Sequence, residues 1–421
     1  MKLNVTTKTW LLALPLIAAI LTASPASAQA PAAAPAEKKD KKSKSTPAEK
    51  AAKLAKNEAT RAAFFKSTSE KIPTINITIA PSPGAVKPLT PLMTDPKKYV
   101  KASVNIGPYN FANVGIHLRG GLGSFRNVND KAGFTLNMNK FGEKKDFFGM
   151  DKWALNNSAQ DGSYLSLLVC NEMLRAAGVP APRISHAIVN LNGMPKGFYC
   201  IQEGYDKDYL GIHFKNSDGN FYDSGFKRDV DQPLELIRTK EDVKDHADLK
   251  ALVAAARIGD PNQRFTEMAK LLDMDTFISG FCIQAILGDW DGYVFNRNNY
   301  RVYHNPATNK IFLLPHGLDQ EFGNADQGPL VPPMQSLLGP AVFNTPEGKA
   351  RYLKRMAEIN TTIMDTDKWL KRLDDLQAKL QPVIASVDAK AGADYPNQVN
   401  RIREFFKVRP KSIDRQLKAA K

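Results

Sequence analysis

The sequence predicts an α+β protein with a β-rich N-terminal lobe, about residues 70–205, and a mainly helical C-terminal lobe, about 206–421. Two observations support this fold class. Apolar and polar residues alternate in short segments of the first third of the folded chain, which is typical of strands with one buried face. Beyond about residue 232, apolar residues recur at helical spacing instead. The chain is long enough for one large two-lobed unit or for two domains.

The first 65 residues are expected to lie outside the folded core. Lys2 and Lys8 precede an apolar run too short to span a bilayer and then an Ala-Ser-Ala cleavage site, so residues 1–28 are predicted to be a secretory signal peptide. Residues 29–65 are rich in Ala, Pro and Lys and are predicted to be a disordered or weakly helical linker. We therefore expect a domain over 66–421 in an exported protein of the periplasm, cell envelope or extracellular space, with no transmembrane helix in the mature chain.

The net charge of +15 limits the classes of partner. The first 60 residues hold ten lysines and four acids, which leaves about +9 for the rest of the chain. This excess fits an anionic partner such as a nucleotide, and it fits an ordinary basic surface equally well. No zinc-finger spacing, aromatic RNA-binding motif or arginine-rich run occurs, so nucleic acid is not an expected partner. Three widely spaced cysteines leave one disulfide or three free thiols open.

The N-terminal lobe is predicted from alternating segments joined by loops. A Gly/Asn-rich loop over 119–131 separates two of them, in an arrangement found where a hairpin covers phosphates and also in ordinary hairpins. Asn192-Gly193 is a strong turn signal for a hairpin over 186–203. A helix is predicted over 161–178, with Asp161 or Ser163 as its cap. The other predicted strands are 75–79, 100–106, 114–118 and 134–138.

The C-terminal lobe is predicted to be helical apart from one hairpin. Its strands are 299–304 and 310–316, joined by the turn 305–309. Helices are predicted over 249–258 and 264–290, and three more follow from about residue 346.

Acids and amides flank this hairpin on both sides. Because a hairpin brings its two flanks together, we expect these groups to converge. Carboxylate and amide oxygens are hard ligands that suit Mg²⁺, Mn²⁺ or Ca²⁺. The residues before the hairpin are Asp289, Asp291, Asn296, Asn298 and Asn299, and those after it are Asp319 and Glu321.

The order of these residues is typical of a kinase catalytic loop. Asp291 is followed five residues later by Asn296, then by the hairpin, and then by Asp319 with Phe-Gly close behind. In protein kinases the first Asp accepts the proton of the acceptor hydroxyl, the Asn holds a metal, and the second Asp binds Mg²⁺ at the phosphates. The Asp-Trp-Asp stretch around Trp290 also allows a weaker interpretation as the metal site of a glycosyltransferase. Trp290 itself is either a core residue or a stacking partner for adenine.

Long, ordered motifs over residues 72–421 resemble the CotH family, the spore-coat-protein-H-like atypical kinases. They include "GIHLRGGLGS", "FFGMDKWALNN", "GVPAPRISHAIVNLNGMPKGFYCIQEGYDKDYL", "GDWDGYVFNRNNYRVYHNP" and "FLLPHGLDQEFG". The resemblance implies a divergent, two-lobed protein-kinase-like fold. It also implies transfer of the ATP γ-phosphate, with Mg²⁺ or Mn²⁺, to a hydroxyl acceptor such as protein Ser or Thr. Some members of the family are better known as coat or surface proteins.

The resemblance assigns roles to individual residues. Asp319 falls on the metal-binding Asp, and Asp291 on the catalytic Asp, with Asp289 as the competing alignment. The metal-binding amide falls on Asn296 or Asn298. His316-Gly317 stand where the family has Trp-Asp, so Asp289 or Glu321 is expected to substitute for the missing acid. Arg119, Lys131 and Glu203 are expected to bind the nucleotide, with a Lys131–Glu203 ion pair at its phosphates.

Two functions follow from these expectations. The first is an exported, metal-dependent kinase that uses ATP and a protein or glycan hydroxyl acceptor. The second is a non-catalytic envelope or coat protein that keeps the same fold, since one lysine of the family's Lys-Lys pair is absent beside Lys131.

Overall fold

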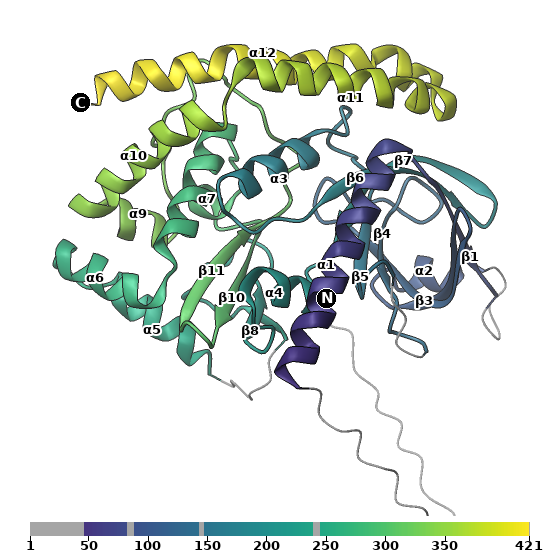
Figure 1. Cartoon of the computed structure of the whole chain (residues 1–421), viewed down its shortest axis with the longest axis horizontal. Coiled ribbons are helices and arrows are strands. Elements are labelled where there is room, and N and C mark those ends of the chain that lie inside the picture. Colours follow the sequence, from purple (N-terminus) through teal and green to yellow (C-terminus); the bar gives the residue numbers. More distant parts are fainter. Residues whose placement is uncertain (1–45, 82–87, 143–146, 239–244, 421) are drawn as a thin grey trace, which may run out of the picture. The chain divides into compact units, whose positions relative to one another are not determined.

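The computed structural model describes residues 46–81, 88–142, 147–238 and 245–420. One compact unit begins at Pro47. The predicted signal peptide over 1–28 lies outside the described residues. The α+β class is confirmed, because a β-rich region comes first and a mainly helical part follows it (Figure 1).

Seven strands of the N-terminal part close into a barrel, which the sequence did not predict. The order around the barrel is β1-β2-β3-β4-β5-β7-β6, and β1 pairs in parallel with β6 to close it. Every second side chain of β1 is buried, so the predicted alternation describes the barrel interior. The strands are β1 (Thr74–Ile79), β2 (Val100–Ile106), β3 (Tyr109–Arg119), β4 (Gly133–Asn137), β5 (Lys152–Asn156), β6 (Ile184–Leu191) and β7 (Met194–Glu203).

The predicted C-terminal hairpin is confirmed as part of a larger antiparallel sheet. The order of this sheet is β11-β10-β8-β9. Tyr300 pairs with Pro315 at the open end of the hairpin, and Asn305 pairs with Lys310 at its turn. The two strands that were not predicted, β8 and β9, contain four residues each, too few for a clear alternation. The bounds are β8 (Asn220–Asp223), β9 (Glu235–Arg238), β10 (Tyr300–Asn305) and β11 (Lys310–Pro315).

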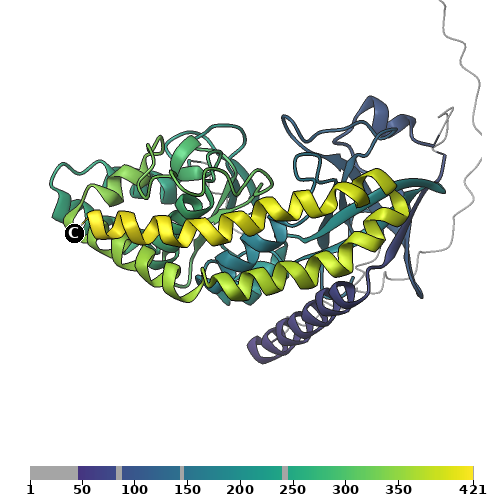
Figure 2. The ribbon, with the colours of Figure 1, turned by 90° about the horizontal axis from the view of Figure 1, so that it is seen from above.

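Helices surround this second sheet and extend toward the barrel. α11 and α12 run side by side (Figure 2). α11 also contacts β7, and α12 contacts α10. In the described part of the chain, no helix is both long and apolar enough to cross a membrane. The helices after α1 are α2 (Thr90–Thr94), α3 (Ser166–Ala176), α4 (Lys207–Phe214), α5 (Ala247–Ala256), α6 (Pro261–Leu271), α7 (Met274–Leu287), α8 (Tyr293–Asn296), α9 (Leu338–Phe343), α10 (Pro346–Thr362), α11 (Thr366–Val387) and α12 (Ala389–Ala419).

Of the two states predicted for the linker, the helical one is found from Pro47 onward, and disorder is wrong there. Helix α1 (Pro47–Glu70) occupies this stretch and contacts β6 and α4. Its Ala, Lys and Glu residues are good helix formers, so the composition that suggested disorder also favours a helix. Phe64 and Phe65 bury their rings in the barrel cluster, and Arg61 is fully buried. The compact unit therefore begins earlier than the predicted boundary at residue 66.

Candidate active site

The end of α7 and the turn after it bring the first acids to the hairpin. α7 is buried on nearly all sides and ends at Gly288, whose left-handed conformation (φ +72°) suits glycine. One short turn of helix, α8, then leads to Arg297 and Asn299, which also have left-handed backbones. These bends fold residues 296–299 back toward Asp291.

Asp291 is held by a ring of three amides. Asn296 Nδ2 donates to Asp291 Oδ1 at 2.6 Å, and Asn298 Nδ2 and Asn299 Nδ2 each donate to Oδ2 at 3.0 Å. The five-residue spacing of Asp291 and Asn296 is therefore a direct hydrogen bond. Asn299 was expected to converge here with the other amides, but the sequence assigned it no individual role.

Asp289 and Glu321 form a buried carboxyl pair beside this ring. Their side chains hydrogen-bond to each other, and Asp289 Oδ2 and Glu321 Oε2 are buried without a partner. Burial, followed by the nearby Asp291 carboxylate, raises the pKa of Asp289 to about 7. Burial, followed by Asp289, raises the pKa of Glu321 well above its usual range, so the pair resists carrying two negative charges.

Asp319 is the fourth residue past the end of β11, and its side chain is half-buried. Burial raises the pKa of Asp319 to about 6, the neighbouring carboxylates of Asp161 and Asp291 add to this, and Arg119 opposes it. Asp161 itself is occupied, because it accepts hydrogen bonds from Ser163 and from the backbone N–H of Ser166 at the start of α3. The two flanks of the hairpin therefore converge as expected, and their carboxylates crowd one another.

The oxygens at this site fit a hard divalent cation only in part. The unpartnered carboxyl oxygens of Asp289 and Glu321, together with Asp319, are ligands of the right type for Mg²⁺ or Mn²⁺. Among the described residues, however, no group of three or more His, Cys, Asp or Glu side chains is arranged to hold a metal ion. A cation here would need amide, phosphate or water oxygens to complete its coordination.

The expected Lys131–Glu203 ion pair does not form. The Glu203 carboxylate is 3.2 Å from Arg61 Nη1 and 3.0 Å from Arg183 Nη1, and it also accepts from the Arg183 backbone N–H. Lys131 instead donates from Nζ to the Tyr164 hydroxyl at 2.7 Å. Arg61 and Arg183, neither of which was predicted as a site residue, therefore pair with Glu203 in place of Lys131.

Lys131 lies among aromatic rings. Its Nζ is 4.7 Å from the centre of the Tyr164 ring and 5.5 Å from that of Tyr199. Burial lowers the pKa of Lys131 to about 8, and the effects of Cys200 and Asp388 only partly oppose this. The side chain is thus a partly desolvated amine without a carboxylate partner in the described residues.

Arg119 lies at the end of β3 and faces the acids. Its Nη1 donates to Gln202 Oε1 at 2.9 Å. Burial lowers the pKa of Arg119 to about 10, as does the nearby Arg301, whereas Asp319 raises it. Arg301 was not predicted as a site residue.

A family model described as CotH kinase protein matches residues 116–413. The chain belongs to the CotH family. The matched segment contains every predicted site residue, from Arg119 to Asp319. It begins inside β3, so α1, β1 and β2 of this CotH protein lie before it. The comparison with curated proteins returned no match.

The aromatic and sulfur side chains of this CotH protein also differ in part from expectation. Trp290, between Asp289 and Asp291, is 58% exposed and so is not a core residue. All three cysteines are buried free thiols. The Asp-Trp-Asp stretch follows helix α7 instead of a strand of a parallel sheet, which disfavours the glycosyltransferase interpretation.

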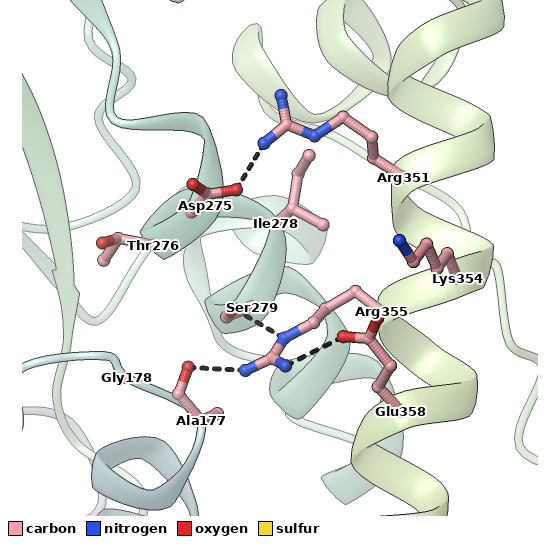
Figure 3. A pocket seen from close by; sticks show the side chains of 10 residues that line it. All are labelled: Ala177, Gly178, Asp275, Thr276, Ile278, Ser279, Arg351, Lys354, Arg355 and Glu358. Carbon is pink, nitrogen blue, oxygen red and sulfur yellow. Dashed lines mark hydrogen bonds and ion pairs between the residues drawn. The ribbon is translucent and has the colours of Figure 1, made fainter.

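A cavity of about 490 Å³ lies elsewhere in the CotH protein, between the end of α3 and helices α7 and α10 (Figure 3). Its arginines are already engaged: Arg351 pairs with Asp275, and Arg355 pairs with Glu358 and Ser279. None of the predicted site residues lines this cavity, so it is separate from the candidate active site.

Proposed function

We propose that this CotH protein is an exported kinase with a two-lobed, kinase-like fold. It transfers the γ-phosphate of ATP to a hydroxyl acceptor, in the first instance protein Ser or Thr. The observation that carries the proposal is that Asp291, held by side-chain amides, lies near Asp319. The two residues come from opposite flanks of the β10–β11 hairpin. Family membership and the ordered spacing of these residues support it.

The hydrogen bonds of Asp291 leave it suited to act as the base. Each carboxylate oxygen has two lone pairs. Among the described residues, Oδ2 uses both of them on Asn298 and Asn299, whereas Oδ1 accepts only from Asn296. One lone pair of Oδ1 therefore remains to accept the proton of the acceptor hydroxyl, and the three amides fix its direction.

Asp319 would hold Mg²⁺ or Mn²⁺, assisted by Asp289 and the amide oxygen of Asn296 or Asn298. The metal supplies neutralisation of the phosphate charge when it is bound. Without a cation, the crowded carboxylates around Asp319 repel an anion. Arg119 contributes a positive charge on the barrel side of the site.

Phosphotransfer with radiolabelled ATP tests the proposal. The full chain with Mn²⁺ or Mg²⁺ should label itself or an added protein acceptor, and Asp319→Asn should abolish the labelling. Asp326→Asn is the matched control, because Asp326 is an exposed acid paired with Arg415. Labelling by Asp319→Asn at the rate of the unaltered protein would refute the mechanism.

A non-catalytic envelope or coat protein is the second candidate. The observation that favours it is Lys131, which is bound to Tyr164 and has no ion pair with Glu203. Calorimetric titration with ATP and Mn²⁺ separates the two, because failure to bind nucleotide supports the non-catalytic role.

A further inference from the structure

Arg301 lies on one of the two inner strands of the second sheet, near Arg119 of the candidate site. It lies on β10 opposite Asp223 of β8 and Leu314 of β11. Its Nε donates to Asp223 Oδ2 at 3.1 Å, and its guanidinium lies 4.8 Å above the ring of Tyr205. The Tyr205 hydroxyl donates to the Pro315 carbonyl, so the platform beneath the guanidinium is itself fixed.

These contacts leave most of the Arg301 fork free. Only Nε makes a hydrogen bond within the described residues, so both terminal nitrogens remain as donors. A planar fork held by stacking on one face is suited to bidentate binding of a phosphate or carboxylate.

Arg119 approaches Arg301 from the barrel. Arg119 donates to Gln202, and Arg301 stacks on Tyr205, which is three residues further along the same segment. Burial is the main cause that lowers the pKa of Arg119, and the nearby positive charge of Arg301 is the second. Lys97 and Lys152 add positive charge to the same region, since each interacts with one of the two arginines.

His316 completes the cluster without neutralising it. Burial lowers the pKa of His316 to about 3, with Arg301 as the next cause, so the imidazole is neutral. Its Nε2 is buried and has no hydrogen-bond partner. The ring also hydrogen-bonds to the backbone of Tyr300, and the neutral imidazole adds no positive charge to the two arginines.

We propose that Arg119 and Arg301 together bind a phosphate chain as a two-arginine clamp. In this clamp Arg301 positions the phosphates, which is the role that was expected of Lys131. The clamp spans the barrel and the second sheet, so a bound phosphate ties the two together beside Asp319. This inference rests on the proposed function for the identity of the anion. Arg301 is a positioning and binding residue and takes no proton in the reaction.

The test is calorimetric binding of inorganic tripolyphosphate to the full chain, with and without Mg²⁺. Arg301→Gln and Arg119→Gln should each weaken binding at least tenfold, and Arg301→Lys should recover part of the loss. Arg257→Gln is the matched control, because Arg257 pairs with Asp231 on the exposed surface. Circular dichroism and thermal unfolding of each variant check that the fold is intact.

Three results would overturn the clamp: no binding by the unaltered protein, binding by Arg301→Gln within twofold of it, or a larger loss from Lys131→Met than from Arg301→Gln. The outcome is separable from that of the kinase proposal. Tripolyphosphate binding that needs both arginines, without any phosphotransfer, supports the clamp and refutes the kinase. Phosphotransfer by Arg301→Gln with an unchanged KM for ATP supports the kinase and refutes the clamp.

Discussion

Replacing Arg61 by alanine should be among the most destabilising single changes in this protein. The Arg61 side chain is fully buried, and its three nitrogens donate to the Gly149 carbonyl, Glu203 and Asp206. Its Nη2 lies 2.7 Å from Asp206 Oδ1. Through these bonds α1 joins the end of β7 to the cap of α4.

The size of the expected loss in unfolding free energy follows from the buried carboxylates that would lose Arg61 as their partner. Removing one partner of a buried ion pair costs about 3–5 kcal/mol, because the other charge stays buried and uncompensated. Glu203 keeps Arg183 as a partner. Within the described residues, the hydrogen bonds left to Asp206 come only from the backbone N–H groups of Tyr209 and Asp151. We therefore expect a loss of about 3–5 kcal/mol, a large part of the stability of a typical domain.

Urea unfolding followed by tryptophan fluorescence measures this loss. Lys66→Ala on the same helix is the control: Lys66 is 78% exposed and 4.0 Å from Glu70, so its loss should cost less than about 0.5 kcal/mol. Arg61→Met restores most of the volume but no charge, and it should remain strongly destabilising. A cost below about 1 kcal/mol for Arg61→Ala would show that this charge cluster does not hold α1 in place.

Three further predictions concern the site, the barrel and pH. Asn299→Ala removes one hydrogen bond to the Asp291 carboxylate, worth about 1.5–3 kcal/mol, and should slow phosphotransfer about 10- to 150-fold; an unchanged kcat would contradict the positioning role. Gly204→Ala places a methyl group 2.1 Å from the Lys152 carbonyl and should cost about 1–3 kcal/mol in urea unfolding, whereas Gly121→Ala meets nothing within 4 Å and should be neutral. Burial lowers the pKa of His186 to about 4, so the unfolded chain binds the proton first and stability falls as pH drops from 6.5 toward 4. Lowering the pH from 7.5 to 5 should cost about 2 kcal/mol through this group alone, and His186→Gln should reduce the drop in unfolding free energy by that amount; equal drops in both proteins would contradict the assignment.

Local signals predicted much of the fold because they depend on near neighbours. The Asn192-Gly193 turn predicted the β6–β7 hairpin, and the segment around Asn305 predicted the turn between β10 and β11. Closure of the barrel escaped prediction because it depends on pairing between β1 and β6, more than a hundred residues apart. The docking of helix α1 escaped prediction because Leu54, Phe64 and Phe65 are its only large apolar residues. This docking also depends on Arg61 meeting acids from β7 and the α4 cap.

The sequence by itself determined the family, the α+β class and the convergence of Asp291, Asn296 and Asp319 on one hairpin. It could do so because these residues are tied by short, ordered spacings. The tertiary structure alone decided which cations meet which acids. Glu203 pairs with Arg61 and Arg183 instead of Lys131, and Arg301 of the second sheet lies near Arg119 of the barrel. Such pairings depend on burial and on distances between elements far apart in the chain, and no local pattern encodes either.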